Sequence, residues 1–354
     1  MTNPNSIPLS PSPVQVSVIV VNWNRRELLR RCLESLALQE DAVFETIVVD
    51  NGSNDSSLEM LEREFRGHPR LRLQVIENRE NMGFCAANNQ GFRAAGGEYF
   101  ALLNNDAEAD PSWLKGLLAV FEGRPDCGMA ASKILVWEDP SRIDKVGHLI
   151  YLDGQNRGQG SGEIDRGQYE RVKEALWPDG CAAMYRRETI AEVGGFDEDF
   201  FAYADDADLG LRARMAGWLC YYAPAAVVRH RRGETLGLLS SRRLELIERK
   251  RVLLAVKLFP WSLLLLNPYY YFLRLAAGAI AAFRGRGEAG KFAGVGGKLR
   301  IARALLRADW QALRMIPATL RKRKRVLRRL SPKQVKQLIL DYRISLRQLA
   351  EEAI

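Results

Sequence analysis

The sequence predicts an α/β fold: a mostly parallel sheet with helices on both faces, followed by a helical and basic C-terminal extension. Two observations support this prediction. Apolar runs alternate with helical patterns from Val16 to Phe121, and beyond Ser240 the chain becomes rich in Leu, Ala and Arg with few strand patterns. Repeated strand–helix units of this kind favour parallel strands lying side by side, covered by the helices.

Each strand of the alternating part is expected to be a short apolar run. The first, VSVIVV from Val16 to Val21, is a β-branched run typical of a strand buried on both faces. Further strands are expected at Thr46–Val49, Leu71–Ile76 and Tyr99–Leu103. Helical spacing of apolar residues predicts helices at Arg25–Leu38, Ser56–Phe65, Phe84–Ala95 and Ser112–Phe121.

The alternation stops between Met129 and Tyr185, where a Gly-rich polar stretch at 154–162 predicts a mobile loop. Two helical patterns and one strand are expected after it, at Arg187–Val193, Asp206–Met215 and Leu219–His230. We therefore expect three segments along the chain. They are a flexible leader at residues 1–13, an α/β domain at 14–240, and a helical, basic region at 241–354.

Composition indicates a folded protein whose charge is unevenly distributed. The chain has 354 residues, of which 47% are hydrophobic and 27% are charged, which allows a substantial core and argues against wholesale disorder. The net charge is +9, but residues 284–329 hold 15 Lys/Arg and 2 Asp/Glu, an excess of +13 that leaves −4 for the rest. The pattern predicts a mildly acidic globular body with a basic C-terminal region.

The five cysteines are dispersed, odd in number and form no C-x-x-C pair. This pattern argues against a disulfide framework or a structural zinc site, and it fits a reducing compartment. The first 13 residues are polar and Pro-rich, without the basic and apolar regions of a signal peptide. We therefore expect a cytoplasmic protein.

Polar residues follow all four predicted parallel strands at the point where each strand ends. In an open parallel sheet, ligands bind at the carboxyl ends of the strands. Asn and Asp also favour ordinary turns, which is the alternative interpretation of any one cluster. Four clusters in succession favour a ligand-binding edge; they are Asn22–Arg25, Asp50–Asp55, Glu77–Phe84 and Asn104–Asp106.

Neither G-x-G-x-x-G nor G-x-x-x-x-G-K-[ST] occurs in the chain, which weakens the interpretation as a dinucleotide-binding or P-loop protein. A phosphate would then be bound in another way. A divalent cation held by carboxylates, with positions open for phosphate oxygens, is the obvious alternative. Asp106, at the end of a buried strand, would supply an oxygen ligand at the predicted edge.

Two further groups of residues carry chemistry. Asp205, Asp206 and Asp208 cluster at a predicted helix start, where one acid is explained by helix capping and a second could act as a general base. His230 ends the last strand and precedes Arg231 and Arg232, a group able to hold a phosphate. A structural histidine and solvated arginines are the alternatives.

Together these motifs resemble an inverting family 2 glycosyltransferase with the Rossmann-like GT-A fold, and are most similar to its bacterial rhamnosyltransferase-like branch. The resemblance covers roughly Val14 to Ser240. It depends on the ordered series VSVIVVNWNR, VVDNGSNDSS, NMGFCAANNQGF, YFALLNNDAEADPSWL, GCAAMYRRETIAEVGGFDEDFFAYADDADLGLRARMAGW and HRRGET. Each motif alone is modest, but the ordered set is highly specific.

The resemblance implies roles for individual residues. Asp206 would be the catalytic base, and Asp106, assisted by His230, would hold Mg²⁺ or Mn²⁺ where the family has a D-x-D motif. The residues implied in nucleotide-sugar binding are Asn22, Asn24, Asp50, Ser53, Asp55, Asn81, Gly83, Phe84, Asn88, Asn105, Gly180 and Asp205. Asn104 replaces the first acid of D-x-D, so metal affinity would depend more on the diphosphate.

The resemblance also implies a reaction and its partners. A sugar would pass from a nucleotide-sugar to a hydroxyl of a glycan or polyprenyl-linked acceptor in cell-envelope polysaccharide synthesis. dTDP-L-rhamnose is the leading donor, and UDP-galactose or UDP-N-acetylglucosamine is the alternative. A catalytically lapsed glycan-binding or nucleotide-binding protein of the same fold is a further alternative, against which the intact Asp50, Asp106, Asp206 and His230 argue.

The C-terminal region carries a different prediction. Residues 259–283 are long and mostly apolar, but Asn267-Pro268 interrupts them and Arg274 lies inside them. With the excess of +13 that follows, this pattern predicts helices lying on the inner face of the plasma membrane rather than spanning it. An ordinary helical subdomain or a homodimer contact is the alternative. Nucleic-acid binding is not expected, because no reader motif accompanies the basic run.

Overall fold

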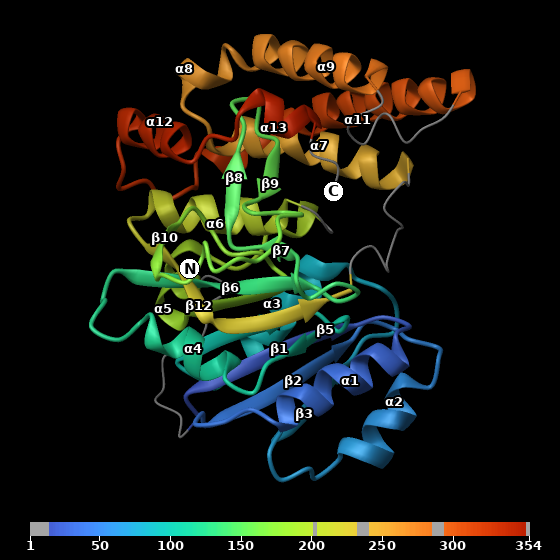
Figure 1. Ribbon diagram of the computed structural model, residues 1–354, viewed down its shortest axis with the longest axis vertical. Helices are drawn as coiled ribbons and strands as arrows, with labels where there is room; N and C mark the ends of the chain where they lie inside the picture. Colours follow the sequence, from blue (N-terminus) through green and yellow to red (C-terminus); the bar gives the residue numbers. More distant parts are fainter. Residues whose placement is uncertain (1–13, 201–203, 232–240, 285–293, 352–354) are drawn as a thin grey trace. The chain divides into compact units, whose positions relative to one another are not determined.

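The computed structural model describes residues 14–200, 204–231, 241–284 and 294–351 and divides the chain into two compact units. The first comprises residues 1–147 and 162–232, and the second comprises residues 148–161 and 233–354. The short segment 148–161 thus makes its contacts with the C-terminal part of the chain. Each unit has its own set of elements (Figure 1).

The first unit is built on the predicted alternation of strands and helices. Four parallel strands pair in the order β4-β1-β2-β3: β1 (Val16–Asn22), β2 (Phe44–Asp50), β3 (Leu73–Glu77) and β4 (Tyr99–Leu103). The helices between and after them are α1 (Arg26–Ala37), α2 (Ser57–Met60) with a π-helical turn at Leu61–Phe65, α3 (Phe84–Ala94) and α4 (Trp113–Ala119). The expected elements are therefore confirmed to within a few residues.

The rest of this sheet is mixed rather than parallel. Beyond β4 the order continues β11-β6-β12-β10, where β11 is antiparallel to both neighbours and β12 is parallel to β6. The bounds are β5 (Ala107–Ala109), β6 (Cys127–Val136), β7 (Ile143–Lys145), β10 (Lys173–Ala175), β11 (Ala182–Arg186) and β12 (Leu219–His230). Helices α5 (Arg187–Val193) and α6 (Asp205–Met215), with a 3₁₀ turn at Glu198–Phe200, complete the unit.

Both faces of the sheet are covered, as the packing of β1 shows. Alternate residues of this strand point to opposite faces. Val16, Val18 and Val20 are buried in a core that also contains residues of α1 and α4. On the other face Ile19 meets α3, where a Cβ on Gly91 would overlap its side chain. This close approach explains why α3 has a glycine in its middle, and it packs α3 directly against β1.

The second unit is mainly helical and includes one hairpin. Its helices are α7 (Ser241–Leu258), α8 (Trp261–Leu264), α9 (Asn267–Phe283), α11 (Gly294–Arg323), α12 (Pro332–Asp341) and α13 (Leu346–Glu351). The hairpin consists of β8 (His148–Ile150) and β9 (Asn156–Gly158). The prediction of a mobile loop over 154–162 was therefore wrong in its first half, where a paired strand forms.

A buried ion network attaches the hairpin to the helices of this unit. Arg274 of α9 donates from Nε to Asp153 Oδ2 at 2.6 Å and from a terminal nitrogen to Glu248 Oε2 at 2.7 Å. Arg251 of α7 donates to the same Glu248 oxygen at 2.9 Å and to the Asp153 backbone oxygen at 3.0 Å. Asp153 and Glu248 are almost wholly buried. Both carboxylates thus meet guanidinium groups, as buried charges require.

Candidate active site

The first cluster at the strand ends forms around Asp50, the last residue of β2. Asn22 ends β1 beside it in register, and both side chains are fully buried. Asn22 Nδ2 donates to Asp50 Oδ2 at 3.0 Å and to Ser53 Oγ at 3.2 Å, while the Ser53 amide donates to Asp50 Oδ1 at 2.8 Å. The Asp50 carboxylate is therefore held in place by neutral donors at the edge of the sheet.

Asn24 and Asp55 join the loops that follow β1 and β2. The Asn24 amide donates to Ser53 Oγ at 2.9 Å, and the Asn24 side-chain oxygen accepts from the Asn54 amide at 2.7 Å. Asp55 Oδ2 accepts from the amide of Arg26, the first residue of α1, at 2.8 Å. Burial raises the pKa of Asp55, but hydrogen bonds from Ser57 and Arg26 outweigh it and lower the pKa. These two residues shape the edge by fixing its loops.

The third cluster leads into α3. Asn81 Oδ1 accepts from the Gly83 amide and from Asn51 Nδ2, both at 2.9 Å. Gly83 has φ of +86°, a conformation that other residues rarely adopt, and this turn positions Phe84 as the first residue of the helix. Asn88 donates to the Phe84 backbone oxygen at 2.9 Å, so its side chain is tied to its own helix.

The fourth cluster brings Asp106 to a histidine. Asn105 Nδ2 donates to Asn22 Oδ1 at 2.7 Å, which joins the ends of β4 and β1. Asp106 Oδ1 lies 3.4 Å from Nε2 of His230, the last residue of β12. Within the part of the chain that the structure describes, this buried oxygen accepts no well-formed hydrogen bond. An acid and an imidazole nitrogen thus face each other at the sheet edge.

Asp144, which the sequence did not single out, completes this group. Its Oδ2 lies 2.8 Å from Nδ1 of His230, and its side chain is fully buried in β7. Asp144 and Asp106 therefore contact opposite nitrogens of one imidazole. A carboxylate on one ring nitrogen fixes the orientation of the ring and directs the other nitrogen, an arrangement common in histidines that bind metals.

The charges around His230 explain its protonation in the absence of a cation. Burial lowers the pKa of His230, but the neighbouring Cys181 sulfur and the carboxylates of Asp106 and Asp144 outweigh it, so the pKa is well above its usual value. Burial also raises the pKa of the Cys181 thiol. The site therefore favours a positive charge between these acids.

The acidic cluster at the start of α6 divides into two groups. Asp208 is fully buried and accepts from Arg212 Nε at 2.7 Å, one helical turn away, so this acid has a structural role. Asp205 is 6% exposed, and Asp206 is half-buried with Oδ1 accepting from the Ala207 amide at 2.7 Å. Of the three acids, Asp205 and Asp206 therefore stay the candidates for chemistry.

Two neighbouring residues, Gly180 and Cys181, connect these groups. A Cβ placed on Gly180 would lie 3.6 Å from the Phe84 ring and 3.9 Å from Asp205 Oδ2, so this glycine lies between the first residues of α3 and α6. The next residue, Cys181, lies close enough to His230 and Asp106 for their charges to act on its thiol. The structure thus brings the third and fourth clusters together with the acids of α6.

The arginines after His230 have separate places. The Arg231 guanidinium lies over the Trp137 ring at 4.5 Å, and its amide donates to the Asp106 backbone oxygen at 3.0 Å. This amide bond fixes the Asp106 turn against the end of β12. Arg232 lies outside the described residues.

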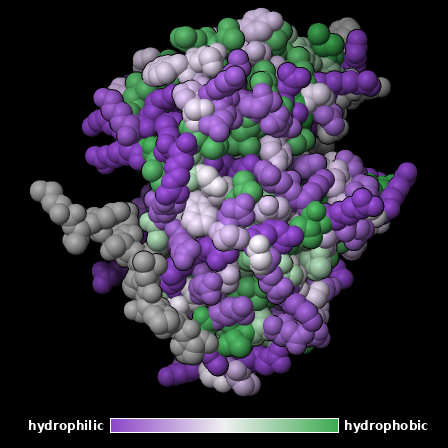
Figure 2. Space-filling model, turned by 90° about the vertical axis from the view of Figure 1, so that its left-hand side faces the viewer, coloured by the Kyte–Doolittle hydropathy of each residue, from purple (hydrophilic) through white to green (hydrophobic). Residues whose placement is uncertain are grey.

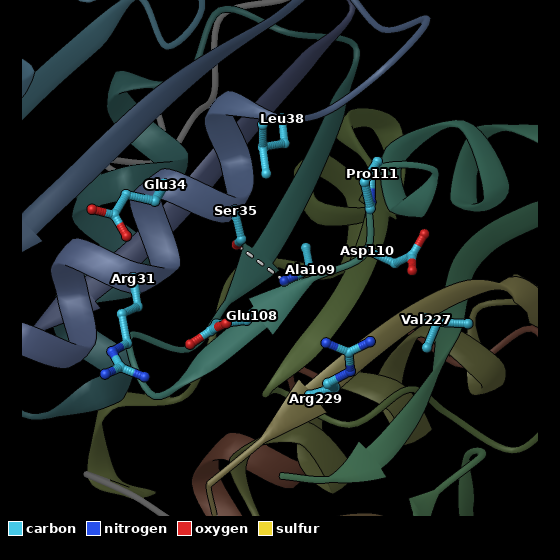
Figure 3. A pocket seen from close by; sticks show the side chains of 10 residues that line it. All are labelled: Arg31, Glu34, Ser35, Leu38, Glu108, Ala109, Asp110, Pro111, Val227 and Arg229. Carbon is cyan, nitrogen blue, oxygen red and sulfur yellow. Dashed lines mark hydrogen bonds between the residues drawn. The ribbon is translucent and has the colours of Figure 1, made fainter.

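A groove of about 510 Å³ lies elsewhere on the first unit, between α1, β5 and β12. Figure 3 shows Arg31 and Glu34 of α1 beside Glu108 of β5, with Arg229 of β12 across the groove. Burial raises the pKa of Glu108, although Arg31 and Arg229 oppose this effect. None of the site residues predicted from the sequence lines this groove, and its charges are mixed.

Comparison with solved structures places the fold. The chain is similar to a mannosyltransferase from Pyrobaculum calidifontis in complex with GDP-Man and Mn²⁺, at 19% identity over 90% of this chain and 89% of that one, with a TM-score of 0.53. It is also similar to GalNAc-T7 with UDP, GalNAc and Mn²⁺, at 17% identity over 61% and 43% of the two chains, with a TM-score of 0.52. The predicted GT-A fold is thereby confirmed.

Comparison with sequences identifies the family. A relative from Mycobacterium tuberculosis, N-acetylglucosaminyl-diphospho-decaprenol L-rhamnosyltransferase, is 26% identical over 62% of this chain and 77% of its own. The O-antigen biosynthesis protein RfbC of Myxococcus xanthus is 31% identical over 59% of this chain and 17% of its own. The model of glycosyl transferase family 2 matches residues 17–194, half of the chain. The chain therefore belongs to glycosyl transferase family 2 and is a glycosyltransferase.

Proposed function

We propose that the enzyme is an inverting, metal-dependent glycosyltransferase that transfers L-rhamnose from dTDP-L-rhamnose to a hydroxyl of a lipid-linked glycan in cell-envelope polysaccharide synthesis. One observation carries the proposal. Gly180 lies beside Phe84 and Asp205, and the next residue, Cys181, lies beside the Asp106–His230 pair. In this proposal an acid for proton transfer and a pair that would bind a cation act on a single substrate.

The residues present fit a divalent cation. Asp106 Oδ1 is buried without a well-formed hydrogen bond among the described residues, and it faces His230 Nε2 across 3.4 Å. Carboxylate oxygen and imidazole nitrogen are suitable ligands for Mn²⁺, and carboxylate suits Mg²⁺. Asp106 and His230 would hold the cation, which would supply positive charge to a leaving diphosphate.

The chain's own residues would carry the proton and hold the donor. In this mechanism Asp206 accepts the proton of the acceptor hydroxyl, whose oxygen forms a bond to the anomeric carbon from the side opposite the diphosphate. The bond between that carbon and the diphosphate oxygen breaks, and its electrons leave with the nucleoside diphosphate. Asp50, held by Asn22 and Ser53, would orient the nucleotide base. A single displacement of this kind inverts the anomeric centre.

The donor and acceptor are proposed from the relative in Mycobacterium tuberculosis, whose name specifies L-rhamnose and a decaprenol-linked acceptor. UDP-galactose and UDP-N-acetylglucosamine are the alternative donors. A lipid-linked acceptor would bring the enzyme to the inner face of the plasma membrane. No helix among the described residues combines the length and the hydropathy needed to cross a bilayer.

The test is release of nucleoside diphosphate from a donor panel with membrane lipid extract as acceptor. The panel contains dTDP-rhamnose, UDP-galactose, UDP-glucose, UDP-N-acetylglucosamine and GDP-mannose, each with Mg²⁺, with Mn²⁺ and with chelator. Metal-dependent release from dTDP-rhamnose alone supports the proposal, and release from another donor corrects the sugar. If no donor is turned over although calorimetry shows binding, the protein is a nucleotide-sugar binder of the same fold.

A further inference from the structure

Large apolar side chains are exposed along three helical segments of the second unit. Their exposed fractions range from 48% for Leu266 to 76% for Leu265. Figure 2 shows apolar surface interspersed with hydrophilic side chains at the height of these helices. The residues are Trp261, Leu265, Leu266, Tyr269, Phe272 and Ile280 around α8 and α9, and Leu306, Trp310 and Leu313 on α11. Soluble surfaces expose such residues singly, so nine within about 50 residues call for an explanation.

The exposed face of α9 carries no charge. Tyr269, Phe272, Ala276 and Ile280 follow at intervals of three or four residues and are all exposed, so they form one stripe along the helix. The exposed Leu265 lies just before the helix begins. A surface helix of a soluble protein normally turns charged or polar residues outward. Here the one charged residue between 259 and 283 is Arg274.

The charge of Arg274 is directed away from this stripe. Its guanidinium binds Asp153 at 2.6 Å and Glu248 at 2.7 Å, inside the unit. Burial lowers the pKa of Arg274, but the two carboxylates outweigh it and raise the pKa above its ordinary value. Arg274, which interrupts an apolar segment in the sequence, therefore leaves the outer face of α9 uncharged.

Helix α11 supplies the complementary feature, a positive charge. Its exposed apolar residues alternate with exposed arginines, namely Arg300, Arg303, Arg307, Arg314 and Arg321. The Arg314 guanidinium lies 4.8 Å from the Trp310 ring, so the long side chain covers apolar surface while it carries charge. Tyr271 of α9 donates to Asp309 of α11 at 3.0 Å, which makes the two helices neighbours.

The combination favours an anionic bilayer over a second copy of the chain. Two copies of this surface would bring arginines against arginines, and like charges across an interface repel each other. A bilayer instead offers acyl chains to apolar side chains and phosphates to arginines at the same depth. Tryptophan and tyrosine settle at that boundary.

We propose that α8, α9 and α11 form a membrane-binding surface, with the α9 stripe in contact with acyl chains and the α11 arginines at anionic headgroups. This surface goes beyond the proposed transfer reaction and does not depend on which sugar is transferred. It would hold the enzyme at the membrane surface, where a lipid-linked acceptor is found. Such a shallow interfacial position does not require a membrane-spanning helix.

The experiment is flotation of the full-length protein with phosphatidylglycerol-containing vesicles and with pure phosphatidylcholine vesicles. We expect binding to the anionic vesicles that weakens as salt is raised. A Leu265→Glu/Phe272→Glu variant should lose at least about tenfold in vesicle affinity, because two charges enter the acyl boundary. An Arg303→Gln/Arg307→Gln variant should lose about 30-fold for the anionic vesicles. Val172→Glu, at an equally apolar exposed position in the first unit, is the matched control and should bind normally.

Several outcomes would overturn the proposal. One is equal vesicle binding by wild type and the Leu265→Glu/Phe272→Glu variant when circular dichroism shows that both are folded. Another is absence of vesicle binding by wild type together with a dimer that this variant dissociates, which would make the surface a self-association interface. Donor turnover, measured on the same samples, separates the two proposals. Vesicle binding without turnover refutes only the proposed transfer reaction. Turnover with a soluble acceptor but without vesicle binding refutes only the membrane-binding surface.

Discussion

Replacement of Asp144 by Asn tests whether the Asp106–His230 pair binds a metal. Asp144 Oδ2 lies 2.8 Å from His230 Nδ1, the distance of a charge-assisted hydrogen bond, and the side chain is fully buried. Asn has the same shape but no charge, and its amide can donate as well as accept. The imidazole then loses both its fixed orientation and the negative charge that makes Nε2 a better ligand.

The expected effect is a loss of about 10- to 100-fold in metal affinity, the usual result of removing a carboxylate that supports a histidine ligand. Mn²⁺ binding is measured by electron paramagnetic resonance with the nucleoside diphosphate present, and donor turnover is measured as a function of metal concentration. Turnover at saturating metal should recover most of the loss, because Asp144 does not contact the reacting atoms in the proposed mechanism.

Side-chain ¹⁵N spectra provide a readout independent of activity. The chain has three histidines, so the resonances of His230 can be assigned by difference from a His230→Asn variant. With Mg²⁺ and nucleoside diphosphate, the wild type should show a neutral ring protonated at Nδ1, and Asp144→Asn should show a mixture of tautomers. Asp139→Asn, on an exposed acid near the same strand, is the control. Unchanged metal affinity together with an unchanged tautomer in Asp144→Asn would refute the reasoning.

Three further predictions concern the base, the packing and the C-terminal unit. Asp206→Asn should lower kcat by about 100-fold or more while calorimetry shows unchanged donor binding; full kcat would exclude Asp206 as the base. Gly210→Ala should lower the unfolding free energy by about 1–3 kcal/mol in thermal melts, because a Cβ there would overlap Trp177. Burial raises the pKa of Glu248, but Arg274 and Arg251 outweigh this effect and lower the pKa, so the ionised carboxylate stabilises the fold. This stabilisation should be lost as pH falls through the lowered pKa, and Glu248→Gln should therefore make the melting temperature less sensitive to acid. Equal acid sensitivity of both proteins would contradict this prediction.

The sequence could predict the α/β unit and its polar edge because both depend on local patterns. Apolar runs fix the strands, and the amides and acids that follow them must lie at one edge once the strands are parallel. The hydrogen bonds from Asn22 to Asp50 and from Asn105 to Asn22 agree with this expectation. The same local reasoning missed the antiparallel placement of β11 between β4 and β6, because nothing in a short strand specifies its partners.

Asp144 could not be found from the sequence for a related reason. It lies in a strand of three residues, Ile143–Lys145, inside a stretch without helical or strand periodicity. Its meeting with His230, 86 residues later, depends on β6 pairing with both β7 and β12. Arg274 was misleading for the same reason, since its partner Asp153 is 121 residues away. Contacts across such separations leave no local pattern.

The distribution of buried charge gives a physical reason to expect a cation beside His230. Among the described residues, several buried acids outside the site meet cationic side chains: Asp208 meets Arg212, Asp179 meets Lys145, and Glu248 meets both Arg251 and Arg274. Asp106 and Asp144 instead lie on opposite nitrogens of one imidazole. A single imidazolium leaves this pair of carboxylates one charge short, and a divalent cation that displaces its proton would neutralise both. Mn²⁺ binding should therefore release about one proton from His230, and isothermal titration in two buffers of different ionisation enthalpy measures that release directly.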